Sequence, residues 1–249
     1  MAFNAADVKN LREMTGVGMM DCKKALAEYD GNMDKAVEIL REKGLAASQK
    51  KAGRIAAEGM AYAAVIDGMG VVVEVNAETD FVAKNEKFTD FVKGVAATVA
   101  ANKPADLDAL MECKYAGTDL TVLQQQQEMV LVIGENIKVR RFARFAEGTS
   151  VAYVHAGGKI GVLVNLDTDL TAEQVEEAGK DAAMQIAALN PRFWDKSQVT
   201  QDVLDEEKKI MMVQMENDPK MANKPEQVIE KIVVGKLNKF YSENCLLQQ

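Results

Sequence analysis

Motifs that are typical of catalytic sites are mostly absent from this chain. His155 is the only histidine, so a histidine-rich metal site is excluded and a Ser-His-Asp triad would have to use this residue. The sequence contains no G-x-S-x-G nucleophile motif and no G-x-x-x-x-G-K-[ST] phosphate loop; "GGKI" at 157–160 lacks the spacing and the hydroxyl of such a loop. We therefore expect a protein that is not an enzyme, with no catalytic residue, no metal site and no cofactor.

Cysteine usage and charge narrow the class of protein further. Cys22, Cys113 and Cys245 are far apart and odd in number, which fits neither a disulfide framework nor a zinc site. The net charge of −8 argues against strong binding to nucleic-acid phosphates. No apolar run approaches the ~20 residues that cross a bilayer, and the first residues resemble neither a signal nor a transit peptide. We expect a cytoplasmic protein that does not bind membranes directly.

The stretch "ETDFVAKNEKFTDFV", residues 78–92, raises the question of where a helix begins. A start at Thr79 or Asp80 would place Phe81 on the buried stripe, which Lys84 and Asn85 would then interrupt. A start with Asn85 as the N-cap gives a helix that opens on an acid and has an uninterrupted apolar stripe. The members of that stripe are Phe88, Phe91, Val92, Val95 and Val99. We favour the later start, which leaves Phe81 and Val82 in an exposed loop suited to contacting a partner.

The elements before this stretch predict a small helical module. Apolar residues recur at helical spacing in three segments of the first 45 residues, and Gly44 is placed as the C-cap of the third. The basic stretch "SQKKAGR" at 48–54 follows. We interpret it as a solvated linker; the alternative is a nucleic-acid patch. Three short helices give only a thin core, so the module is expected to serve in recognition.

Beyond the linker, the apolar period changes to that of strands and helices in alternation. "DGMG" at 67–70 predicts the turn of a β-hairpin, and helices are expected from the mid-80s to Asn102, at 105–113 and at 119–133. A weak internal repeat relates "VEVNAETDF" at 73–81 to "VLVNLDTDL" at 162–170. We read two related α+β halves with antiparallel sheets; the alternative is chance similarity between strand-to-helix junctions.

The last segment is typical of a protruding antiparallel helical hairpin. Its two apolar stripes are Leu204, Met211 and Met215 on one arm and Ile229, Val233 and Phe240 on the other, with the loop at 217–225. Such stripes usually close the hairpin itself; the alternative is contact with a partner, including self-association.

The fold class expected is therefore α+β. The predicted parts are a three-helix (UBA-like) module at 1–45, a basic linker at 46–54, a first core half at 55–146, a second core half at 147–198, a helical hairpin at 199–241 and a tail at 242–249.

Two stretches, "LREMTGVGMMDCKKAL" at 11–26 and "VNAETDFVAKNEKF" at 75–88, closely resemble the two signature regions of bacterial elongation factor Ts. "IGENIKVRR" at 133–141 and "YVHAGGKIGVLV" at 153–164 extend the resemblance in the same order. The resemblance implies a guanine nucleotide exchange factor that binds elongation factor Tu, displaces Mg²⁺ and promotes GDP release for GTP reloading. Because family members usually continue past the hairpin with a returning strand, we expect the second half to be incomplete at its C-terminal end; the alternative is a naturally short form.

The resemblance also implies which residues bind the partner. Thr79, Asp80, Phe81 and Val82 match the T-D-F-V motif, whose Asp-Phe pair reaches into the nucleotide-binding domain of the partner and disturbs its Mg²⁺ site. Further contacts implied by the resemblance fall on Arg12, Met19, Met20, Ile133 and His155.

Several of these residues have an ordinary structural interpretation as well. Met19 and Met20 are adjacent on a helix, so they cannot both face inward and one should be exposed. Ile133 would by default belong to the core, and His155 would be a structural histidine. The competing hypothesis for the whole chain is an interaction scaffold whose UBA-like module binds a peptide or protein.

Overall fold

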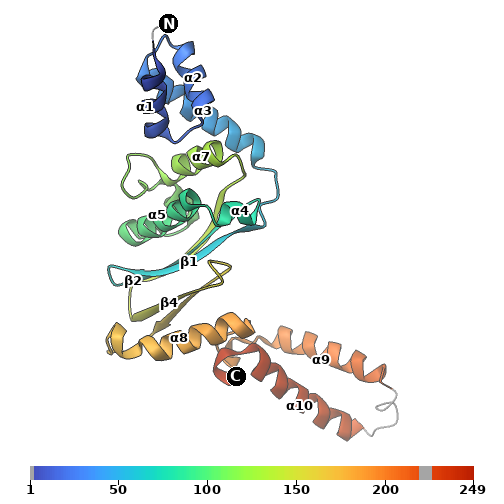
Figure 1. The fold of residues 1–249 in the computed structure, drawn as a ribbon. Helices are drawn as coiled ribbons and strands as arrows, with labels where there is room; N and C mark the ends of the chain where they lie inside the picture. Colours follow the sequence, from blue (N-terminus) through green and yellow to red (C-terminus); the bar gives the residue numbers. More distant parts are fainter. Residues whose placement is uncertain (1–2, 219–225) are drawn as a thin grey trace. The chain divides into compact units, whose positions relative to one another are not determined.

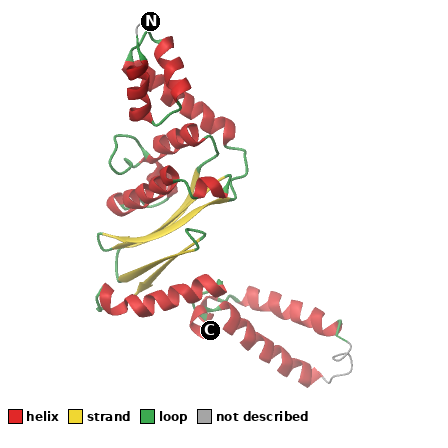
Figure 2. Cartoon of the chain, in the orientation of Figure 1, coloured by secondary structure: helices red, strands yellow, loops and turns green. Residues whose placement is uncertain are grey.

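The computed structural model describes residues 3–218 and 226–249 and confirms an α+β chain (Figures 1 and 2). It divides into two compact units, Met1–Ala183 and Met184–Gln249. The division into six parts predicted from the sequence is finer than this and stays a prediction.

The first unit begins with a three-helix module. Its helices are α1 (Ala5–Thr15), α2 (Met19–Glu28) and α3 (Met33–Lys51). Asn4 begins α1 with a capping box, because its side chain accepts hydrogen bonds from the Ala6 and Asp7 amides while Asp7 bonds back to the Asn4 amide. Val8, Leu11 and Leu26 lie in the buried cluster of the module.

The predicted end of the third helix is wrong. Gly44 does not cap α3 but lies buried in its middle, where an added Cβ would lie 3.2 Å from the carbonyl oxygen of Gln127. Gly44 thus lets α3 run close against the next layer, and the helix continues to Lys51. Most of the stretch 46–54, expected to be a linker, is therefore helical, because packing rather than the local C-cap signal decides the boundary.

The main core is formed by a three-stranded antiparallel sheet covered by helices (Figure 1). The strands are β1 (Glu58–Ile66), β2 (Met69–Ala77) and β3 (Lys138–Phe145), and the helices are α4 (Asp80–Ala83), α5 (Glu86–Asn102), α6 (Leu107–Glu112) and α7 (Val122–Ile133). The predicted hairpin is confirmed: its turn is Asp67 and Gly68, both with positive φ (49° and 80°), which suits the twist of the strands.

Helix α5 confirms the later of the two helix starts. Asn85 is its N-cap and accepts a hydrogen bond from the Lys87 amide at 2.9 Å. All five residues of the predicted stripe are buried: Phe88, Phe91, Val92, Val95 and Val99. They pack with Val71, Val73 and Val75 of β2, which alternate inward along the strand.

A second, two-stranded antiparallel sheet packs against the first (Figure 2). It consists of β4 (Thr149–His155) and β5 (Ile160–Leu166). The Ala61 amide of β1 donates a hydrogen bond to the Gly158 carbonyl in the β4–β5 turn at 2.8 Å, which joins the two sheets. The helix that follows, α8 (Ala172–Leu189), buries Val175 and Ala183 in the first unit.

The second unit contains the predicted helical hairpin. Its helices are α9 (Gln201–Glu216) and α10 (Glu226–Asn244), with short helices η1 (Lys196–Gln198) and η2 (Leu246–Gln248). The six predicted stripe residues all belong to its hydrophobic cluster: Leu204, Met211, Met215, Ile229, Val233 and Phe240. Most of the predicted loop, 217–225, lies outside the described residues.

Candidate functional site

Helix α4 turns Phe81 outward and the two residues after it, Val82 and Ala83, inward. Phe81 is 82% exposed, whereas Ala83 is 7% exposed and Val82 packs against the main core. The turn is closed by hydrogen bonds from the Lys84 amide to the Phe81 carbonyl and from the Asn85 amide to the Val82 carbonyl. The exposure predicted for Phe81 is confirmed, but Phe81 and Val82 lie in a short helix rather than a loop, and Val82 is not presented outward.

Asp80 forms an exposed ion pair beside Phe81. Its Oδ2 lies 2.9 Å from Nζ of Lys84, one helical turn away. The hydrogen bond and charge of Lys84 hold the pKa of Asp80 below its ordinary value, and Lys159 of the β4–β5 turn adds to this effect. Asp80 is therefore a carboxylate at neutral pH.

The residues just before α4 are held by side chains from the segment after α7. The Glu135 carboxylate accepts hydrogen bonds from the Glu78 and Thr79 amides, both at 3.0 Å, and from the Thr79 hydroxyl at 2.7 Å. Glu78 in turn accepts from the Asn136 amide at 2.6 Å and from Arg54 at 3.4 Å. Sequence reasoning missed this network, although "IGEN" and "KKAGR" lay within the stretches singled out.

The structure brings Ile133 and the β4–β5 turn to the same end of the main sheet as α4. Ile133 ends α7 and packs against the main core, two residues before Glu135. Lys159 of the β4–β5 turn forms an ion pair with Glu58, the first residue of β1. These elements meet where β1 begins and β2 ends.

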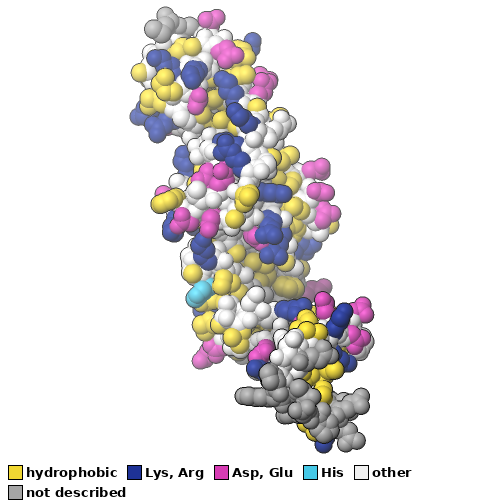
Figure 3. Space-filling view, turned by 90° about the vertical axis from the view of Figure 1, so that its right-hand side faces the viewer, with side chains coloured by type: hydrophobic (Ala, Val, Ile, Leu, Met, Phe, Trp, Pro, Cys, Tyr) yellow, Lys and Arg dark blue, Asp and Glu magenta, His cyan; other side chains and the backbone are white. Residues whose placement is uncertain are grey.

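His155 is exposed at the end of β4, and Figure 3 shows the histidine side chain (cyan) at the surface. Its Nδ1 lies 2.8 Å from the Tyr153 hydroxyl. This is a hydrogen bond between neighbours on one strand, and nothing in it points to catalysis.

Arg12, Met19 and Met20 lie on the helical module and are all exposed. The expectation that one of the two methionines is exposed is confirmed, and in fact both are: Met19 is 50% and Met20 63% exposed. The buried side of α2 begins only at Cys22, so its first turn extends past the core of the module. Among the described residues, these three share no hydrogen bond or ion pair with α4.

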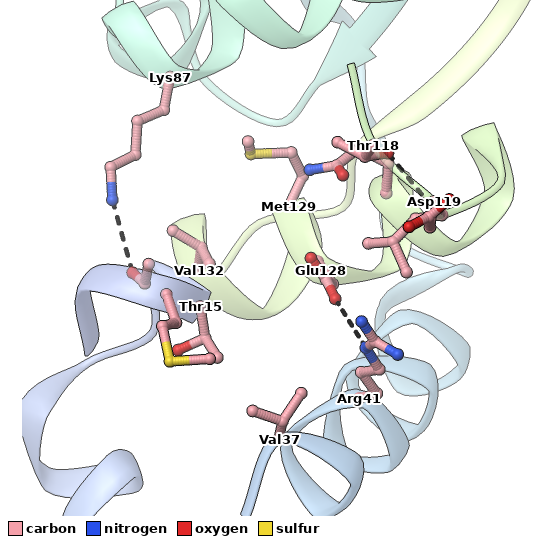
Figure 4. Close-up of a pocket in the computed structure, with 13 residues that line it drawn as sticks. Thr15, Val37, Arg41, Lys87, Thr118, Asp119, Glu128, Met129 and Val132 are labelled. Carbon is pink, nitrogen blue, oxygen red and sulfur yellow. Dashed lines mark hydrogen bonds and ion pairs between the residues drawn. The ribbon is translucent and has the colours of Figure 1, made fainter. Parts of the chain in front are cut away.

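A groove of about 530 Å³ is lined by residues of the module, of α7 and of the loop before α7 (Figure 4). Lys87 reaches the Gly16 carbonyl on one side, and Arg41 of α3 pairs with Glu128 of α7 at 3.5 Å on the other. Burial raises the pKa of Glu128 despite the Arg41 charge. These contacts attach the module to the core.

All three cysteines are free. The described part of the chain contains no group of three or more His, Cys, Asp or Glu side chains placed to hold a metal ion. Across residues 3–218 and 226–249, we find no helix with the length and apolar character that a membrane span requires.

Comparison with known proteins identifies the family. The family model described as elongation factor TS matches residues 78–249. Elongation factor Ts of Syntrophotalea carbinolica is 49% identical over 252 residues, which span 100% of this chain and 82% of that protein. The proteins of the same name from Clostridium botulinum (strain Eklund 17B) and Magnetococcus marinus are 46% and 44% identical, spanning 99% and 100% of this chain and 81% and 82% of those proteins. The chain therefore belongs to the elongation factor Ts family of translation elongation factors.

Proposed function

We propose that this chain is a guanine nucleotide exchange factor that binds elongation factor Tu, displaces Mg²⁺ and promotes GDP release for GTP reloading in the cytoplasm. The observation that carries the proposal is Phe81, an aromatic side chain 82% exposed on a hydrogen-bonded turn. Leaving it in water forgoes the roughly 1.5–3 kcal/mol that burying a Phe side chain provides. An aromatic side chain held outward in this way suits insertion into a partner.

The proposed action needs no catalytic group or cofactor on this chain. Mg²⁺ contacts the β-phosphate of a bound nucleoside diphosphate, so displacing the ion weakens nucleotide binding. By linkage, a factor that weakens GDP binding must itself bind the nucleotide-free partner more tightly than the loaded one. Phe81, with Thr79, Asp80 and Val82 forming its turn, is the proposed wedge against the Mg²⁺ site.

One wedge cannot supply all the energy required. Nanomolar nucleotide binding corresponds to about −12 kcal/mol, several times the contribution of one buried aromatic. Additional contacts with the partner must therefore contribute the remaining binding free energy. We assign these to the remaining candidates, which are Arg12, Met19 and Met20 on the module, Ile133 at the end of α7 and His155 at the end of β4.

A stopped-flow assay with fluorescent GDP tests the proposal. The intact protein should accelerate GDP release from loaded elongation factor Tu, and Phe81→Ala should reduce the acceleration roughly 30-fold or more, the size of an interface hot spot. Phe145→Ala is the matched control, because Phe145 is an exposed phenylalanine at the far end of β3. Unaltered GDP release with the intact protein would refute the proposal.

The two exposed methionines favour one alternative, a scaffold whose UBA-like module binds a peptide or protein. A scaffold of this kind would retain partner binding in Phe81→Ala, and only changes at Met19 or Met20 would weaken it. Self-association through the α9–α10 hairpin also stays a prediction, and sedimentation of the intact protein tests it.

A further inference from the structure

The network around Glu135 continues the main sheet beyond its last strand pair. Strands β2 and β3 pair antiparallel and their pairing ends at Asn76 and Lys138. Extending that register would place Glu78 opposite Asn136 and Thr79 opposite Glu135. Carboxylate side chains take the place of backbone carbonyls here, since Glu135 binds the Glu78 and Thr79 amides and Glu78 binds the Asn136 amide.

The hydrogen bonds between these two segments run in both directions, and a third segment, at Arg54, binds to both. Each of the two facing segments supplies one carboxylate and at least one backbone N–H to the other. The Asn136 side chain, 7% exposed, donates to the Arg54 carbonyl at 2.8 Å, and Arg54 lies 3.4 Å from Glu78. Three stretches of chain that are far apart in sequence are thus tied together directly before α4.

Glu135 is the member of the network that acts most directly on the turn carrying Phe81. Its Oε1 accepts a hydrogen bond from the Thr79 hydroxyl. The same hydroxyl oxygen accepts a hydrogen bond from the Val82 amide at 3.4 Å, which makes Thr79 the N-cap of α4. Hydrogen bonds to an ionised group are about twice as strong as neutral ones. Loss of the carboxylate would leave two amides and one hydroxyl without their acceptor.

We propose that Glu135 is a positioning residue for nucleotide exchange. It fixes the β2–α4 junction so that Phe81 is held in the orientation that the partner receives. This role rests on the function proposed above, but the ordering of the turn is a property of the free protein and can be measured without any partner.

The first experiment therefore uses the intact free protein. Amide hydrogen exchange is compared at residues 78–84 in wild type, Glu135→Ala, Glu135→Gln and the control Glu147→Ala, which alters an exposed glutamate in the β3–β4 turn. We expect Glu135→Ala to accelerate exchange there about tenfold. Glu135→Gln keeps one acceptor oxygen, so its exchange rate at residues 78–84 should lie between those of wild type and Glu135→Ala. The exchange rate of Glu147→Ala should match that of wild type.

The second experiment measures GDP release as a function of factor concentration. If Glu135 preorganises the turn, the alanine variant spends less time in the competent conformation, which raises the concentration needed for half-maximal release. We expect a rise of about tenfold with the maximal rate within about twofold of wild type. Phe81→Ala should instead lower the maximal rate. Adding Glu135→Ala to Phe81→Ala should have little further effect, because both act through one side chain.

The possible results separate the two proposals. Unchanged hydrogen exchange at residues 78–84, or altered hydrogen exchange with an unchanged half-maximal concentration, would overturn the positioning role. So would additive effects of the two substitutions. If Glu135→Ala does not fold, Glu135→Gln decides on the same criteria. If the wild-type protein does not accelerate GDP release from elongation factor Tu, the proposed function is wrong. The hydrogen-exchange experiment then still decides whether Glu135 orders the turn.

Discussion

Two strand-to-helix junctions of this chain share a sequence pattern and differ in what holds them. "VEVNAETDF" at 73–81 leads from β2 to α4, and "VLVNLDTDL" at 162–170 leads from β5 toward α8. In both, an asparagine bonds to the neighbouring strand: Asn76 donates to the Glu58 carbonyl and Asn165 accepts from the Ser150 hydroxyl. The asparagine of the pattern therefore links its strand to the neighbouring strand in both halves.

The junctions diverge after the strand. At the first, the Glu135 carboxylate binds Glu78 and Thr79 and the turn displays Phe81 at 82% exposure. At the second, the Thr149 hydroxyl donates to the Leu170 carbonyl, the Thr168 hydroxyl accepts from the Leu170 amide, and Leu170 is 50% exposed. Similar local sequence thus ends in an exposed apolar side chain at both junctions, but only the first junction is bound by a carboxylate from a distant segment.

The largest effect expected from this difference concerns the two threonines. Thr79→Val removes a charge-assisted hydrogen bond and the N-cap of α4, so it should lower the free energy of unfolding by about 2 kcal/mol. Thr168→Val removes one exposed local bond and should cost about 0.5 kcal/mol or less. Chemical denaturation measures both. Equal losses would mean that the two junctions are held alike.

A smaller effect concerns the strand position before each junction, Glu74 in the first repeat and Leu163 in the second. Burial would raise the pKa of Glu74, but hydrogen bonds from Arg141 (2.6 Å) and Arg140 (2.8 Å) outweigh it and hold the pKa below its ordinary value of 4.5. A lowered pKa stabilises the fold above the unfolded value, and that stability is lost as the pH falls through the folded value.

Glu74→Gln should therefore cost about 1 kcal/mol at pH 7, a figure kept small because both arginines are largely exposed. The difference from wild type should shrink as the pH falls below 4.5. Denaturation across this pH range measures it. A Leu163→Ala variant provides the comparison, since its stability loss should not follow the carboxylate titration. A Glu74→Gln loss that stayed constant from pH 7 to pH 3 would contradict the ion-pair explanation.

The smallest effect concerns Asp80 and Lys84, an exposed pair that belongs to the first junction. Lys84→Ala should let the pKa of Asp80 rise toward its ordinary value of 3.8, because the largest cause of the lowering is the Lys84 hydrogen bond. NMR titration of the Asp80 carboxyl carbon measures the change. Lys93→Ala, which removes a similar pair on α5, should leave Asp80 unchanged. An unaltered Asp80 titration in Lys84→Ala would rule out this hydrogen bond as the cause.

The features that could be predicted from the sequence are those decided by neighbouring residues. The Asn85 cap, the apolar stripe of α5 and the Asp67–Gly68 turn each depend on a few adjacent positions. The exposure of Phe81 was predictable for the same reason, since polar Lys84 and Asn85 interrupt any buried stripe that includes it.

The features that could not be predicted depend on contacts between distant segments. Gly44 looked like a helix end because its close approach to Gln127 cannot be read from local sequence. That both Met19 and Met20 are exposed could not be predicted, because helical spacing does not say where the core of the module stops. Glu135 carried no signal of its own, because its partners lie 56 and 57 residues away.

Helix α3 has a consequence for how the first unit unfolds. Leu40 belongs to the cluster of the module, whereas Ala47 on the same helix packs against the main core. On α7, Val132 joins the module cluster and its neighbour Ile133 the main core. Helices α3 and α7 each contribute side chains to both clusters. Unfolding either cluster would remove packing contacts from the other. We therefore expect the module and the main sheet to melt in one cooperative transition.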